Sequence, residues 1–191
     1  NRNHLEVGDL MEAYHTDMKN VSRTVLYKEI QDMDFSWDVN AYLQEALICP
    51  DGFNISLLED LVTLPHLETA TIRDKGLVVK VSDLSDDWSR PYVHLENLEQ
   101  ENVSRAYSCL DREAILVSTI RTLKPSIIKA SKECPVWINP NILVICPNNT
   151  IDAEYLCMKL AELTIRTIGV GVPHISKRYL LRQGIVYPEI S

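Results

Sequence analysis

The last third of the chain alternates between continuous apolar runs and an amphipathic stretch. Residues 142–146 form an unbroken apolar run between two prolines, which indicates a strand covered on both faces. Leucines then recur at spacings of four and three over 156–163, as on a helix with one face in the core. Residues 168–172 are apolar again. This pattern predicts a βαβ unit at 142–172, within a βαβ-type core at 136–191.

A second pattern, at residues 67–84, is typical of a β-hairpin. Residues 67–73 are rich in β-branched side chains, and residues 77–81 form a second apolar run. Between them lies Asp74-Lys75-Gly76, whose glycine suits the tight connection of two antiparallel strands. The pattern therefore predicts that these two segments pair with each other.

Two further stretches have the spacing of amphipathic helices. One is 109–123, which has carboxylates near its start and cations near its end. The other is 9–33, whose apolar side chains step by three or four residues. This second helix either packs on the core or docks on a partner protein. Its candidate partner-binding residues are Met11, Tyr14, Met18, Val21 and Val25.

Together these elements predict an α/β fold, with α+β as the alternative. The expected architecture is a mixed sheet with the βαβ unit, the hairpin and flanking helices, including a short helix at 176–182 and a last strand at 185–187. A chain of 191 residues, 46% of them hydrophobic, is long enough to bury a substantial core. We expect a single domain over 1–191.

The cysteines favour an intracellular location, in the cytoplasm or the nucleus. The chain has 5 cysteines, an odd number, without a Cys-x-x-Cys pair, which argues for reduced thiols. Four Asn-x-Ser/Thr sequons, at Asn20, Asn54, Asn102 and Asn148, point the other way, but only in a secreted protein would they matter. No apolar run approaches the roughly 18 residues of a membrane helix, so no membrane association is expected.

Charge is divided unevenly along the chain. The net charge is −8, yet residues 121–191 hold 9 Lys/Arg against 5 Asp/Glu. An acidic molecule does not attract nucleic acid over long range, but a local basic surface remains an alternative. Its candidate RNA-binding residues are Lys124, Lys129, Lys132, Lys177, Arg178 and Arg182.

The order of elements near the C-terminus resembles that of a known RNA-binding module. Strand, helix, strand, the basic pair Lys177-Arg178 and a last strand follow one another over about 50 residues. This order is similar to the anticodon-binding domain of class II aminoacyl-tRNA synthetases. The resemblance implies RNA as a partner.

No residue pattern assembles a catalytic, metal or cofactor site. A Gly-rich phosphate loop, a G-x-S-x-G elbow and a His-x3-His pair are all absent from the sequence. Glu68, Asp74, Lys75 and Lys80 have the residue types of a metal-dependent hydrolase or nuclease, which is a further alternative. The sequence favours a non-catalytic α/β interaction module with a protein partner, acting as part of a larger protein or assembly. It does not indicate an oligomeric state.

Overall fold

The computed structural model describes residues 49–70, 75–87, 89–103, 105–163 and 174–188. Contacts along the chain divide it into two units, Asn1–Pro50 and Asp51–Ser191, and the account below concerns the second. The predicted helix at 9–33, with all its candidate partner-binding residues, lies outside the described residues. The single-domain expectation therefore stays a prediction.

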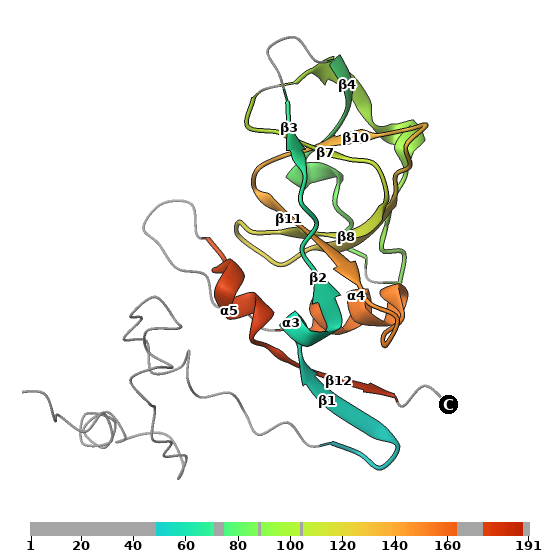
Figure 1. The fold of residues 1–191 in the computed structure, drawn as a ribbon, viewed down its shortest axis with the longest axis vertical. Coiled ribbons are helices and arrows are strands. Elements are labelled where there is room, and N and C mark those ends of the chain that lie inside the picture. Colours follow the sequence, from blue (N-terminus) through green and yellow to red (C-terminus); the bar gives the residue numbers. More distant parts are fainter. Residues whose placement is uncertain (1–48, 71–74, 88, 104, 164–173, 189–191) are drawn as a thin grey trace, which may run out of the picture. The chain divides into compact units, whose positions relative to one another are not determined.

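Strands in the described residues form three sheets, drawn in Figure 1. The first is a two-stranded ribbon of β1 (Phe53–Leu57) and β12 (Gly184–Pro188). The second has the order β3 (Glu68–Thr69), β7 (Ser108–Leu110), β10 (Val136–Ile138), β4 (Lys75–Val79), β6 (Glu99–Asn102). The third has the order β2 (Val62–Thr63), β11 (Ile142–Pro147), β8 (Glu113–Ser118), β9 (Pro125–Lys129), β5 (Tyr92–Val93).

Most strand pairs are antiparallel, but β10 with β4 and β5 with β9 run parallel. The helices are few: α3 (Leu58–Leu61), α4 (Ala153–Glu162) and α5 (Lys177–Leu181), with 3-10 turns at Val81–Asp83 and Leu95–Asn97. Mixed sheets with few helices confirm the predicted fold class, α/β or α+β. Among the described residues, no helix combines the length and apolar composition that crossing a membrane requires.

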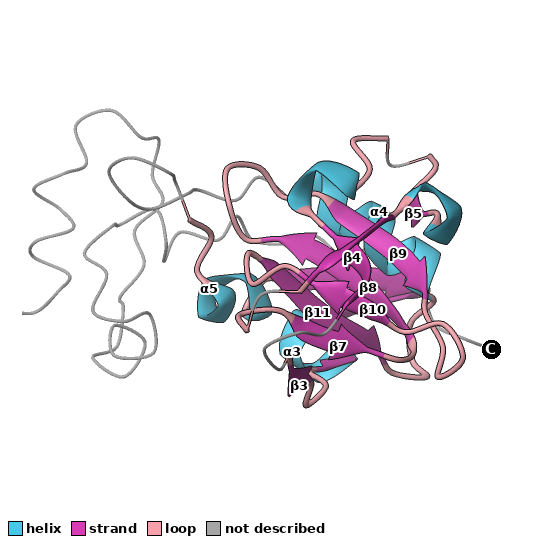
Figure 2. Ribbon diagram, turned by 90° about the horizontal axis from the view of Figure 1, so that it is seen from above, coloured by secondary structure: helices cyan, strands magenta, loops and turns pink. Residues whose placement is uncertain are grey.

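The third sheet is the middle layer of the fold and is buried on both faces. Ala114 and Leu116 of β8 pack with Val136 of the second sheet. Ile115 and Val117, on the opposite face of β8, pack in the cluster that includes α3, α4 and α5. Figure 2 shows the strands of both sheets overlapping in projection, with α3, α4 and α5 around them. A strand with two buried faces needs apolar side chains at every position, which explains the unbroken runs in β8 and β11.

The structure confirms the first half of the predicted βαβ unit. β11 forms where expected, and Ile145 is fully buried. Helix α4 follows it and buries Leu156 and Leu160. Its N-cap is Asp152, whose carboxylate accepts a hydrogen bond from the Tyr155 N–H at 2.9 Å.

The second half of that unit, residues 168–172, lies outside the described residues. Both neighbours of β11 in the sheet, β8 and β2, run antiparallel to it. No parallel strand lies beside β11 in the part of the chain that the structure describes. The predicted short helix and final strand near the C-terminus are confirmed as α5 and β12.

Two predictions were wrong. Residues 67–84 do not form a hairpin, because β3 pairs with β7 while β4 pairs with β6 and β10. Residues 109–123 are not a helix, because they contain the end of β7 and the whole of β8. In the first case the pairing partners lie further along the chain, whereas β8 pairs with the next strand, β9, and with β11.

Candidate interaction surfaces

The β1–β12 ribbon has one face in the core and one face in solvent. Ser56 and Ile185 lie opposite each other in the register. The Ser56 hydroxyl lies 3.1 Å from the Tyr187 hydroxyl, and Ile185 is only 2% exposed. The Tyr155 hydroxyl of α4 donates to the Val186 carbonyl at 3.0 Å, which fixes the ribbon to the helix layer.

The alternate positions of β1 are large apolar residues on the other face. Phe53, Ile55 and Leu57 are 37%, 41% and 37% exposed. Val186 lies opposite Ile55 in the register and extends this surface onto β12. We call Phe53, Ile55, Leu57 and Val186 the ribbon face. Contiguous apolar side chains exposed on one face of a sheet are a common mark of a protein–protein contact.

The six candidate RNA-binding residues lie in two groups. Lys129 is the last residue of β9, Lys124 lies just before this strand, and Lys132 follows it. Lys177, Arg178 and Arg182 lie on or just after α5. Helix α5 contacts α3, which leads into β2 at the opposite edge of the sheet from β9 and β5. Figure 2 also shows α5 and β9 far apart in projection.

Two of the lysines beside β9 already have partners within the fold. The Lys124 ammonium lies 2.6 Å from an Asp86 carboxylate oxygen. The Lys129 ammonium lies over the Tyr92 ring, 5.3 Å from its centroid. The Tyr92 hydroxyl also donates to Glu154 of α4, and this hydrogen bond is the main cause that raises the pKa of Tyr92 to about 12. The structure thus brings Lys177 and Arg178 together but does not gather the six residues on one surface.

The residues of the nuclease alternative are not brought together as a metal site. The Lys80 ammonium lies 2.5 Å from Glu101 and 3.3 Å from Glu99, both on the edge strand β6. These carboxylates raise the pKa of Lys80, and the lysine in turn lowers the pKa of Glu101. Asp74 lies outside the described residues. Within those residues, no group of three or more His, Cys, Asp and Glu side chains is placed to hold a metal ion.

Sequence reasoning did not find the ribbon face. Its two strands are 131 residues apart at the Ser56–Tyr187 contact, so no local pattern shows that they pair. The alternation of Phe53, Ile55 and Leu57 with polar residues was the available signal.

Comparison with known proteins gives a fold likeness and no family. No family model matches the chain, and no curated protein does. One similar solved structure is the HsdS subunit from Thermoanaerobacter tengcongensis, with 13% identity over 77% of this chain and 36% of that chain, at a TM-score of 0.48.

Another is a chain of a type I R-M system, solved to explain its complex assembly and conformational transition. It has 14% identity over 85% of this chain and 40% of that chain, at a TM-score of 0.50. The present chain therefore spans well under half the length of either protein. At such identity, the likeness concerns the fold alone.

Proposed function

We propose that this chain is a non-catalytic α/β interaction module within a larger protein or assembly, and that a protein partner packs on the ribbon face. The observation that carries the proposal is the exposure of three large apolar side chains on one face of β1, while on the opposite face of the ribbon Ser56 is half-buried and Ile185 of β12 lies in the core. The side chains of Ile55 and Leu57 keep 41% and 37% of their surface exposed, and a partner that covers them adds apolar contacts.

The size of the ribbon face indicates what kind of contact it makes. Full burial of a large apolar side chain contributes about 1.5–3 kcal/mol, so covering the remaining two-fifths contributes about 0.6–1.2 kcal/mol for each of Phe53, Ile55 and Leu57. Association costs at least about 4 kcal/mol in lost translational and rotational freedom. The ribbon face alone does not offset that cost. It is the centre of a wider interface, as expected inside a stable assembly rather than in a brief encounter.

The fold comparison supports the same proposal. The type I R-M chain with a TM-score of 0.50 belongs to a system described by its complex assembly. This chain corresponds to 40% of that protein's length. A fold of this kind therefore occurs as one part of a longer polypeptide inside a multisubunit complex.

Charge placed on the ribbon face tests the proposal. The full chain is isolated from the cells that make it, in three forms: unchanged, Ile55→Lys, and the matched control Asn54→Lys on the same strand. Native mass spectrometry measures the complexes, and circular dichroism checks that each form is folded. We expect a complex of fixed stoichiometry with the unchanged chain and with Asn54→Lys, and its loss with Ile55→Lys. A folded Ile55→Lys form that retains the complex would overturn the proposal.

RNA binding and metal-dependent hydrolysis stay sequence-based predictions that neither the geometry nor the fold likeness supports. For RNA, Lys177 and Arg178 are the pair that the fold places together. Charge reversal at both should abolish a salt-sensitive RNA affinity if α5 carries it. An unchanged affinity in filter binding would exclude this helix.

A further inference from the structure

Strand β11 is paired along most of its length on one side, but on its other side a neighbouring strand covers only its end. On one side, β8 pairs with Ile142 through Ile145. On the other side, β2 pairs only with Cys146 and Pro147. The chain leaves β2 through Leu64 and Pro65, and a proline lacks the N–H that would continue the ladder. Within the described residues, no strand covers this side of β11 between Ile142 and Ile145.

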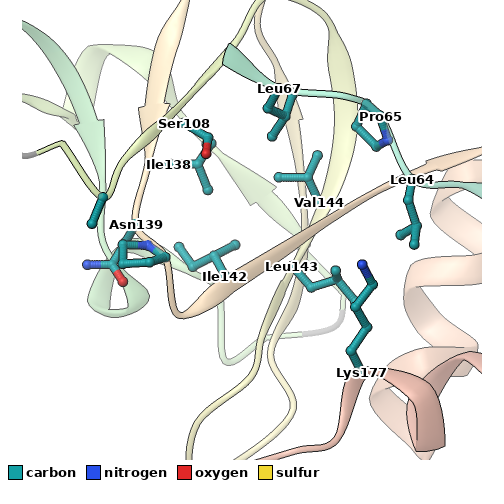
Figure 3. Close-up of a pocket in the computed structure, with 12 residues that line it drawn as sticks. Leu64, Pro65, Leu67, Ser108, Ile138, Asn139, Ile142, Leu143, Val144 and Lys177 are labelled. Atoms are coloured by element: carbon teal, nitrogen blue, oxygen red, sulfur yellow. The ribbon is translucent and has the colours of Figure 1, made fainter. Parts of the chain in front are cut away.

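A pocket of about 300 Å³ lies at this uncovered side (Figure 3). Ile142, Leu143 and Val144 all line it. Successive side chains of a strand point to opposite faces of the sheet. A pocket that touches three consecutive residues must therefore run along the strand's edge. Figure 3 agrees, because Val144 points toward Leu67 while Leu143 points toward Lys177.

The hydrogen-bond pattern directs the backbone of Val144 into this pocket. The Thr119 N–H donates to the Asn141 carbonyl at 2.9 Å, so Asn141 faces β8. Backbone groups in an antiparallel pair alternate in direction, so Leu143 and Ile145 face β8 and Val144 faces away from it. On that outer side the Cys146 carbonyl accepts from the Thr63 hydroxyl, at 3.4 Å. The N–H and C=O of Val144 point to the stretch that β2 does not reach.

The lining of the pocket determines the chemistry of an occupant. Most of its lining residues are apolar, with Leu67 and Ile138 on the Val144 side and Leu64 toward β2, and polar atoms contribute about half of the exposed wall. Among the described residues that line it, Lys177 is the one with a charge, and its side chain reaches toward Leu143. An occupant with an apolar group on one side and a carboxylate on the other complements both.

We propose that the uncovered edge of β11 binds an extended segment of a partner protein, which adds a short strand opposite Val144. Paired residues in adjacent strands share one face. The partner residue opposite Val144 therefore places an apolar side chain toward Leu67 and Ile138. Its sequence neighbours point to the face of Leu143, where Lys177 pairs with an Asp or Glu. The recognised segment is acidic–apolar–acidic in an extended conformation, a mode in which main-chain bonds give affinity and side-chain pockets give specificity.

An array of blocked pentapeptides tests this site with the full chain. Each peptide has a central Val, Ile, Leu, Phe or Tyr, flanked on both sides by Glu in one series and by Lys in the other. We expect binding by at least one peptide of the Glu series and by none of the Lys series. Lys177→Glu should lower the affinity for the Glu-series peptides by about 5- to 10-fold and raise the affinity for the Lys-series peptides. Arg178→Glu is the matched control, because Arg178 is the next residue on α5 but does not line the pocket.

A second experiment tests the proposed backbone hydrogen bonds between the peptide and Val144. Methylation of the central peptide nitrogen removes its N–H and should abolish binding, and the bound peptide should slow hydrogen exchange at Val144. If neither peptide series binds the unchanged protein, the proposal is overturned. It is also overturned if the Lys177→Glu protein binds the Glu series as tightly as the unchanged protein does, or if the methylated peptide binds as tightly as the unmethylated one. Val144 exchange that is already slow without peptide, together with no peptide binding, would show that the chain's own segment fills the groove and would also overturn it. Ile55→Lys should leave peptide binding unchanged, so this site and the ribbon face fail independently.

Discussion

Cys157 illustrates how the packing of a single residue sets its chemistry. Its side chain is 1% exposed on the core side of α4. Burial in apolar surroundings raises the pKa of this thiol to about 12, because the thiolate would lose its hydration. Cys146, partly buried on β11, also has a raised pKa, again mainly through loss of solvent. These thiols pack as small apolar groups and are poor nucleophiles at neutral pH.

We therefore expect Cys157 to resist iodoacetamide at pH 8 in the native protein and to react fully in urea. Cys49, which is exposed, should be modified in the native state and serves as the internal control. Peptide mass spectrometry after timed alkylation measures both sites. Rapid native modification of Cys157 would contradict its placement in the core.

The same pKa shift has a consequence for stability. A thiol whose pKa is raised in the folded state favours folding below its unfolded pKa of about 8.5. That contribution is lost as the pH rises toward 12. The free energy of unfolding, measured by urea titration, should decline between pH 8 and 11. The decline should be smaller in Cys157→Ala when each protein is compared with its own value at pH 8.

At the scale of elements, the first turn of α4 is capped by one side chain, that of Asp152. Asp152 accepts the Tyr155 N–H, which would otherwise lack a partner in the first turn. Glu154 adds a second carboxylate near the positive end of the helix dipole. The leucine spacing predicted this helix from the sequence.

Asp152→Ala should lower the free energy of unfolding by about 1 kcal/mol, since an N-cap is lost. Asp152→Asn retains an oxygen acceptor and should recover most of that stability. Urea titration followed by far-ultraviolet circular dichroism measures both variants. Equal loss in the Ala and Asn forms would show that charge, rather than the capping bond, is what matters.

Local patterns predicted the elements that have one clear apolar stripe or a short apolar run between prolines or glycine. Helices α4 and α5 and strands β11 and β12 belong to this group, although β12 pairs with a strand 131 residues away at the Ser56–Tyr187 contact. The run 114–117 was assigned to a helix because a strand buried on both faces has no alternation to reveal it. Strand β6 was missed because Glu99–Asn102 is polar throughout, and it is held at the sheet edge by Lys80. Both candidate surfaces depend on strand pairing, which no local pattern specifies.

At the scale of the molecule, β8 joins the two main clusters of buried residues. Ile115 faces the helix layer and Leu116 faces the second sheet, and both are fully buried. The two clusters therefore share one strand and are expected to unfold together rather than in turn.

Ile115→Ala and Leu116→Ala should each lower the free energy of unfolding by about 2–5 kcal/mol, the usual range for a large side chain removed from a core. Each variant should still unfold in one transition, with tryptophan fluorescence and circular dichroism giving the same midpoint. Separate midpoints in either variant would show that the layers are independent.

The pairing of β1 with β12 sets the order in which the polypeptide can finish folding on the ribosome. The Tyr187 partner of Ser56 is made 131 residues later, which at about 5–20 residues per second is about 7–26 seconds of translation. During that interval both faces of β1 are exposed to water, including the face of Ser56, which later becomes half-buried. A chaperone that binds extended apolar segments of nascent chains would find β1 accessible during this interval, and would release it to its partner strand when β12 leaves the exit tunnel.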